Sequence, residues 1–280
     1  MENWGDGILE QWSIGRRELR YTSLHHSNTP VFQLFLATLS FRNRCRIHNK
    51  ILSGEIPLED LIRQIVIWAL PVLAAIIFHE VAHGWVAYRL GDPTAARLGR
   101  LTLNPLAHID IFGTILVPLM LIVANSPFVF GYAKPVPVNY ANLRNPKRDM
   151  IWVAAAGPVM NLLLALGFTI LWKSLAGLTG GESAKLLASG YPAFLAPIVL
   201  MAQSGILINI TLAVFNAFPL PPLDGGRVLV GLLPEVLSRK LARIEPFGFI
   251  ILIILIMTRT LDRIIDPPTE FLLKLYLGVL

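Results

Sequence analysis

One apolar segment, residues 64–88, constrains the fold of this chain more than any other feature. Its length matches the roughly 20 residues that an α-helix needs to cross the hydrocarbon core of a bilayer. A single polar motif, His79-Glu80-Val81-Ala82-His83, interrupts it. Two histidines four residues apart on a helix lie on the same face, one turn from each other. The segment therefore predicts a membrane helix that carries two imidazoles and a carboxylate.

The composition supports a membrane protein. The 280 residues are 54% apolar and 15% charged, whereas soluble domains carry about 25% charged residues. The net charge of +6 comes from short basic clusters between apolar segments, which suits orientation in a bilayer better than binding of nucleic acid. We expect a lipid bilayer and no nucleic acid among the partners. Cys45 is the only cysteine, so neither an intramolecular disulfide nor a cysteine metal cluster can form.

Five apolar regions predict an all-α polytopic membrane protein with four to six transmembrane segments. They lie at residues 61–90, 111–124, 150–175, 191–233 and 246–257, and a proline-rich break at 219–226 interrupts the fourth. Residues 127–138 alternate turn formers with β-branched and aromatic residues, which predicts a hairpin or a re-entrant loop.

The predicted organisation is one membrane domain, residues 56–265, between an N-terminal extension of unknown role, 1–55, and a C-terminal tail, 266–280. Basic clusters at 97–100 and 144–148 flank the second and third apolar regions. Because basic loops stay on the cytoplasmic side, these clusters predict a multi-pass protein of the inner (plasma) membrane. Its metal motif would lie nearer the cytoplasmic face.

The chemistry of the motif points to zinc. A catalytic zinc ion takes three protein ligands and keeps a fourth position for water, and His79 and His83 supply two. Asp224, in the proline-rich break, is the candidate third ligand because a carboxylate at membrane depth is costly unless it binds something. The alternative is a helix cap in a turn at the membrane surface, since Asp before Gly-Gly is common in turns. The distant histidine pair favours the ligand.

Glu80 also has two interpretations. A structural role requires a buried ion-pair partner, and the neighbouring helix sequence offers none. As a general base, Glu80 would take a proton from a zinc-activated water and later protonate the leaving amine.

Three blocks in order give the chain a specific resemblance. They are Phe78-His79-Glu80-Val81-Ala82-His83, Gly157-Pro158-Val159-Met160-Asn161 and Asn216-Ala217-Phe218-Pro219-Leu220-Pro221-Pro222-Leu223-Asp224-Gly225. Across residues 60–260 the chain resembles the site-2 protease family of intramembrane zinc metalloproteases, in its compact prokaryotic form without a PDZ-like or nucleotide-sensing domain. The resemblance implies one Zn²⁺ ion held by His79, His83 and Asp224, with Glu80 as the catalytic base.

The resemblance also suggests roles for further residues. Asn161 and Asn216 could donate hydrogen bonds to the substrate backbone or to the oxyanion, or could join helices to one another. Gly157 is interpreted as a site of close helix packing. His108 is interpreted as a surface histidine, with a supporting or substrate-side role as the alternative. The loop at 130–138 resembles the family's membrane-associated strand region, where substrate would add as a strand.

The function that we expect is therefore that of an intramembrane zinc metalloendopeptidase. It would cleave transmembrane or juxtamembrane segments of membrane proteins. A zinc-binding membrane transporter is an alternative, because transporters also use broken helices and intramembrane carboxylates. It would not need a glutamate beside a ligand histidine, and no inverted repeat is visible. A non-catalytic membrane scaffold is a second alternative, and the intact Glu80 and Asp224 argue against it.

Overall fold

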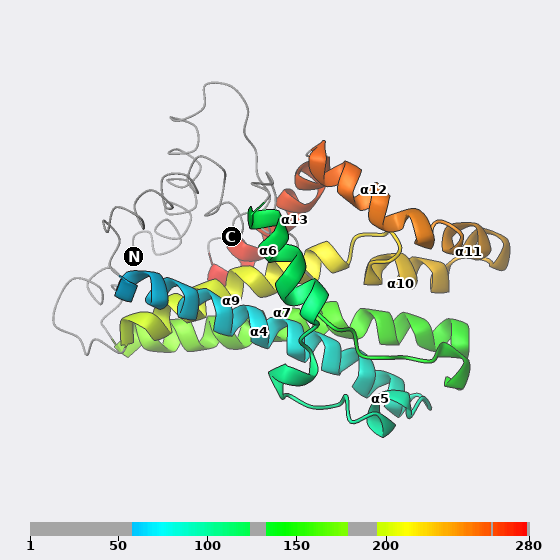
Figure 1. Ribbon diagram of the computed structural model, residues 1–280, viewed down its shortest axis with the longest axis horizontal. Helices are drawn as coiled ribbons and strands as arrows, with labels where there is room; N and C mark the ends of the chain where they lie inside the picture. The colour runs from blue at the N-terminus through cyan, green and yellow to red at the C-terminus, as the bar shows by residue number, and fades with distance from the viewer. Residues whose placement is uncertain (1–57, 124–132, 179–194, 259, 279–280) are drawn as a thin grey trace.

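The computed structural model describes residues 58–123, 133–178, 195–258 and 260–278, and Figure 1 shows their arrangement. Within these residues the chain forms helices joined by extended segments, with no β-strand. This confirms the predicted mostly helical class. The predicted extension at 1–55 and the first residues of the predicted hairpin, up to 132, lie outside the described residues.

Three long helices form the body of the molecule. They are α4 (Leu58–Arg89), α7 (Pro146–Leu178) and α9 (Leu195–Asn216), and each packs against the other two (Figure 1). All three are long and apolar enough to cross a membrane, and their candidate spans are Val66–Arg89, Pro146–Gly177 and Pro197–Asn216. Apolar side chains cover these helices on nearly every face, as expected where lipid replaces water as the solvent.

The predicted number of four to six membrane segments is not confirmed. The second apolar region forms a short π-helix, Ile111–Leu116, followed by α6 (Val117–Val123). The last apolar region forms α12 (Glu245–Met257), whose 13 residues span about 20 Å, less than the hydrocarbon core of roughly 30 Å. Of the predicted hairpin, the described residues 133–138 are extended, without a paired strand among the described residues.

The proline-rich break predicted within the fourth apolar region lies after α9. Residues 217–223 turn the chain back towards the three-helix body, and α10 (Asp224–Leu232) then packs against α7. The turn is closely packed, because a Cβ at Gly226 would overlap the backbone nitrogen of Pro221. Asp224 thereby becomes the first residue of α10, where a negative charge interacts favourably with the helix dipole.

The C-terminal helices α11 (Glu235–Ala242) and α13 (Thr260–Leu277) complete the described fold. Helix α13 packs along α9, where Leu273 and Leu277 join a buried cluster with Ile206 and Ile210. It runs as one helix through residues 265 and 266, where the predicted membrane domain ends and the predicted C-terminal tail begins. The predicted domain boundaries stay predictions.

A buried carboxylate fixes the end of α4. Asp92 is fully buried and accepts hydrogen bonds from the backbone N–H of Thr94 at 3.1 Å, the side chain of Asn142 at 2.8 Å and the backbone N–H of Asn139 at 2.7 Å. Burial alone raises the pKa of Asp92, but the hydrogen bonds from these partners outweigh it, so the pKa lies below its ordinary value. The ionised carboxylate thus joins the end of α4 to the segment before α7.

We predict that Asp92→Asn lowers the free energy of unfolding at pH 7 by about 2 kcal/mol, because hydrogen bonds to a charged acceptor are lost. Because folding lowers the pKa, this stabilisation is present above the unfolded value of about 4 and disappears as the pH falls through the folded value. Thermal unfolding in detergent should therefore separate the variant from the unmodified protein at pH 7, and the difference should shrink as the pH falls below about 4. Glu235→Gln, at an exposed carboxylate, is the control and should change little.

Candidate metal centre

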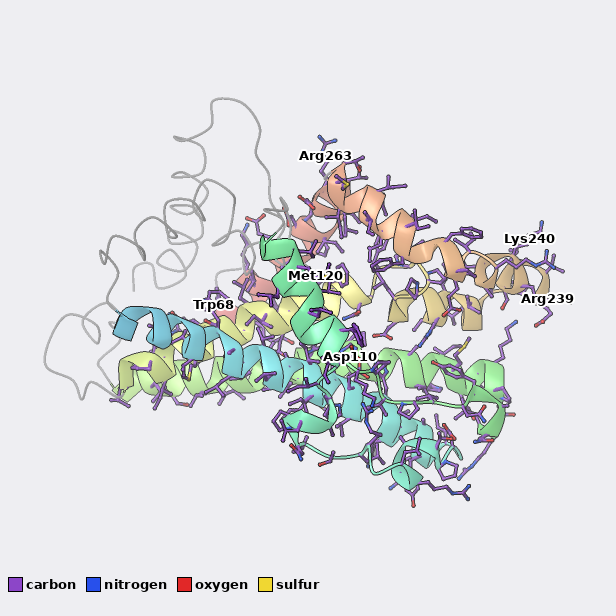
Figure 2. The ribbon with its side chains drawn as sticks, viewed as in Figure 1. Trp68, Asp110, Met120, Arg239, Lys240 and Arg263 are labelled. Atoms are coloured by element: carbon purple, nitrogen blue, oxygen red, sulfur yellow. The ribbon has the colours of Figure 1, made fainter. Side chains whose placement is uncertain are left out.

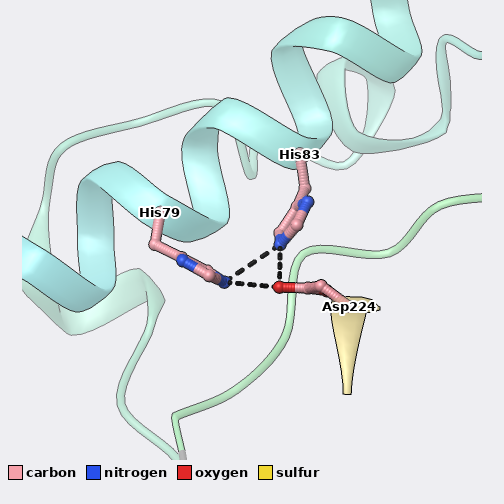
Figure 3. A group of neighbouring side chains, drawn as sticks. All are labelled: His79, His83 and Asp224. Atoms are coloured by element: carbon pink, nitrogen blue, oxygen red, sulfur yellow. Dashed lines mark hydrogen bonds and ion pairs between the residues drawn. The ribbon is translucent and has the colours of Figure 1, made fainter. Parts of the chain in front are cut away.

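The three predicted ligands converge on one point. His79 and His83 lie one turn apart on α4, and Asp224 reaches them from the start of α10 (Figure 3). The Oδ2 atom of Asp224 lies 3.1 Å from Nε2 of His79 and 3.3 Å from Nε2 of His83. The two Nε2 atoms are 3.0 Å apart. Residues far apart in the sequence thus bring three ligand atoms together.

Helix α7 orients both imidazoles through their outer nitrogens. His79 donates its Nδ1 proton to Oδ1 of Asn161 at 2.6 Å, and His83 donates its Nδ1 proton to the backbone oxygen of Val153 at 2.7 Å. With the protons at Nδ1, each Nε2 carries a lone pair directed towards Asp224. Outer hydrogen bonds of this kind fix the tautomer and the ring orientation of metal-binding histidines.

The arrangement fits Zn²⁺. Three acceptor atoms that face one another within hydrogen-bonding distance repel each other unless a cation lies among them. Zinc–ligand bonds of about 2.0–2.1 Å in a tetrahedron place the ligand atoms about 3.3 Å apart, close to the observed separations. Two neutral imidazoles and one carboxylate are also the type of ligand set that catalytic zinc takes in other hydrolases.

The backbone of α7 touches the two rings at Gly157. A Cβ at this position would lie 2.5 Å from Nε2 of both His79 and His83, well inside van der Waals contact. The predicted role in close packing is therefore refined: the absent side chain of Gly157 makes room for the ligand nitrogens themselves.

Asn161 is fully buried behind His79. Besides accepting from His79, it donates its amide protons to the backbone oxygen of Ala75 at 3.1 Å and to Oδ1 of Asn209 at 2.9 Å. It thereby joins α4, α7 and α9. These contacts correspond to the helix-joining alternative and add a role in holding the imidazole, while the predicted contact of Asn161 with substrate stays a prediction.

A cavity of about 390 Å³ adjoins the metal ligands. Glu80 and Asn216 line it, and the amide nitrogen of Asn216 donates to the backbone oxygen of Leu212 within α9. Two lining residues, Tyr140 and Arg227, were not predicted. The sequence signal for Arg227 is its place one helical turn after Asp224, which puts both on the same face of α10. No comparable local signal identifies Tyr140.

Arg227 joins three elements at the edge of the cavity. It donates to the hydroxyl of Tyr140 at 3.3 Å and to Glu245, the first residue of α12, at 3.2 Å. Burial alone lowers the pKa of Arg227, but the facing Tyr140 and Glu245 outweigh it, so the pKa rises and the charge is kept. A fixed positive charge therefore lies in the same cavity as Glu80 and the metal ligands.

The interpretation of His108 as a surface histidine is wrong. Its exposed fraction is 3%, and Nε2 donates to the backbone oxygen of Thr102 at 2.8 Å. The backbone oxygen of His108 accepts from the N–H of Lys134 at 2.9 Å. These two hydrogen bonds connect His108 to the segment between α5 (Thr94–Arg97) and the π-helix and to Lys134. The side chain does not line the cavity at the metal centre.

Comparison with known proteins identifies the family of this chain. The model of peptidase family M50 matches residues 67–258, which include the three candidate ligands and Glu80. The chain belongs to peptidase family M50, the family of site-2 proteases. This confirms the expected resemblance and identifies the protein as a peptide hydrolase.

Two relatives illustrate the similarity. The candidate zinc metalloprotease YwhC of Bacillus subtilis (strain 168) is 39% identical over 213 residues, which are 74% of this chain and 90% of YwhC. The candidate zinc metalloprotease Rip2 of Mycolicibacterium smegmatis is 30% identical over 195 residues, 68% of this chain and 66% of Rip2. No solved structure matches the chain.

We predict that Gly157→Ala strongly weakens zinc binding, because the added methyl group displaces the ligand nitrogens. Zinc content after dialysis against a chelator would measure the loss. Gly167→Ala, in the same helix, is a matched control because a Cβ there meets nothing within 4 Å. Equal zinc retention in both variants would contradict the role assigned to Gly157.

We also predict that Asn161→Ala lowers zinc affinity by about 10- to 100-fold, the usual loss when a hydrogen-bond partner of a ligand histidine is removed. Asn209→Ala leaves the contact between Asn161 and His79 in place and should have a smaller effect. Competition with a chromogenic chelator would measure both affinities.

Proposed function

We propose that this M50 peptidase is an intramembrane zinc endopeptidase that cleaves transmembrane or juxtamembrane segments of membrane proteins. The observation that carries the proposal is the position of Glu80 and the two histidines within the apolar helix α4, beside a cavity with polar groups that Asp224 also lines. The names of the relatives, which describe zinc metalloproteases, agree with the ligand set.

The depth of the centre supports cleavage within the membrane. His79 lies about 15 Å along α4 from Arg89, and Gly157 lies about 16 Å along α7 from Pro146. These two helix ends are neighbours, because the N–H of Arg144 donates to the backbone oxygen of Leu90 at 3.1 Å. Half of a hydrocarbon core of roughly 30 Å is about 15 Å, so a substrate bond bound at this centre would lie near the middle of the membrane.

The residues around the cavity would have separate roles in peptide hydrolysis. Bound Zn²⁺ would supply a Lewis acid that polarises the scissile carbonyl and lowers the pKa of water. Glu80, adjacent in sequence to the ligand His79, takes the proton of the attacking water and transfers it to the leaving amine. Asn216 and Arg227 line the same cavity and provide hydrogen-bond donors for the substrate carbonyls. The substrate helix has to unwind locally, because its own hydrogen bonds engage those carbonyls.

The charge distribution supports an inner-membrane orientation in which the active site lies nearer the cytoplasmic face than the opposite face. Basic residues gather at the end of the bundle where α4 ends and α7 begins, and they include Arg89, Arg97, Arg144, Lys147 and Arg148. Arg239 and Lys240 of α11 extend from the end of the molecule opposite to that of Trp68 (Figure 2). The positive-inside rule assigns such an end to the cytoplasm.

We predict that Glu80→Gln retains zinc but lowers cleavage by a factor of about 10² to 10⁴, the usual contribution of a general base. His79→Ala should lose both zinc and cleavage. The probe is a single-span peptide with a central proline and a fluorophore and quencher at its two ends, in vesicles of phosphatidylethanolamine and phosphatidylglycerol.

Glu270→Gln, on α13 and outside the cavity, is the matched control and should cleave normally. Unchanged cleavage by Glu80→Gln would overturn the proposed base. Absence of cleavage by the unmodified, zinc-loaded protein would overturn the proposed function for this class of substrate.

A further inference from the structure

The extended segment Lys134–Asn139 runs beside α4, from Glu80 at the metal centre to Asp92 just beyond the end of the helix. Its sequence is Lys-Pro-Val-Pro-Val-Asn, and we refer to it as the proline strap. A residue that precedes proline is restricted to extended backbone conformations, so Lys134 and Val136 both favour this shape. Prolines also lack an N–H group. Val136 therefore supplies the single backbone donor in the tripeptide Pro135-Val136-Pro137.

This single donor forms a hydrogen bond with Glu80. The backbone N–H of Val136 donates to Oε2 of Glu80 at 2.7 Å. Both residues line the cavity, and the Val136 side chain is buried, with 6% of its surface exposed. One carboxylate oxygen of Glu80 is therefore held by the strap.

The strap packs against α4 at a glycine, where no side chain separates it from the helix backbone. Gly84 lies one helical turn after Glu80 on the same face, and a Cβ there would lie 2.6 Å from Cγ1 of Val136. The absence of a side chain at Gly84 thus allows Val136 to approach α4 closely enough for its N–H to reach Glu80. The strap thus packs against α4 at Gly84 and also donates a hydrogen bond to Glu80 of the same helix.

Both ends of the strap are fastened to other parts of the fold. At its start, the N–H of Lys134 donates to the backbone oxygen of His108 at 2.9 Å. Arg100 donates to the backbone oxygens of Lys134 at 2.9 Å and Pro135 at 3.3 Å. At its other end, the N–H of Asn139 donates to the buried Asp92. These contacts prevent the strap from sliding along α4.

We infer that the proline strap is a positioning element for the general base, in which the N–H of Val136 holds Glu80 in one orientation beside the metal ligands. The inference rests on the proposed function of Glu80.

Amide hydrogen exchange tests the contact without requiring zinc or cleavage. Because Pro135 and Pro137 carry no N–H, and the first two residues of a fragment lose their label, a fragment covering 133–137 reports on the amide of Val136 alone. In the full-length protein in detergent, Glu80→Ala should accelerate exchange of this amide by about tenfold or more. Glu80→Gln, which keeps an acceptor oxygen, should preserve slow exchange. Equal exchange in the unmodified protein and Glu80→Ala would overturn the inference.

Cleavage of the model peptide tests the consequence for catalysis. Val136→α-hydroxyvaline replaces the N–H by an ester oxygen and keeps the side chain, whereas Val136→Ala keeps the N–H and removes most of the side chain. We expect the ester to lower kcat by about 10- to 100-fold with little change in KM or zinc content, and to lose more kcat than Val136→Ala.

Val138→α-hydroxyvaline is the matched control, because it places the same ester after Pro137 and its N–H has no acceptor among the described residues. The Val136 ester should lose at least about ten times more kcat than the Val138 ester. Equal losses from the two esters, or a larger loss from Val136→Ala than from the Val136 ester, would overturn the inference. The proposed function would survive that result as long as the unmodified protein cleaves the peptide.

Discussion

The structure depends on the direct contact between the backbone of α7 and the imidazoles of α4. At Gly157 the two helices come so close that the ligand nitrogens occupy the space of a side chain. The same stretch of α7 supplies the acceptors for both outer nitrogens, through Val153 and Asn161. One helix thus sets the position, the rotation and the tautomer of both histidines. Asp224 then needs only to approach from the open side.

The polar groups around His79 form a chain of hydrogen bonds, which reduces the free-energy cost of burying them. Around His79, the side chain of Asn161 connects to Asn209, which in turn donates to the backbone oxygen of Gly205 in its own helix. In a bilayer an unpaired polar group costs several kcal/mol. The network therefore allows a polar centre to exist among three apolar helices, and the same hydrogen bonds hold those helices in register around it.

Much of the candidate site could be predicted from the sequence because its chemistry is local. The spacing of His79 and His83 identifies a shared helix face, and the cost of a carboxylate in an apolar region marks Asp224. Arg227, Tyr140 and Val136 were missed because their roles depend on which segments meet in space. His108 was misassigned for the same reason: the backbone oxygen that its ring contacts cannot be read from the residues around it. The helices were predictable from apolar length, but the number of membrane spans was not, since short apolar regions can fold as broken or partial helices.

The order of the ligands along the chain has a consequence for the making of the protein. The histidines lie on the first described helix, whereas Asp224 follows α9, the third of the long helices. A chain emerging from the ribosome therefore carries two ligands long before it has the third. The centre is complete only after the last long helix has been inserted and the proline-rich turn has folded back. A nascent copy of this hydrolase would thus be inert towards the membrane proteins inserted beside it, and proteolytic competence would follow the completion of its own fold.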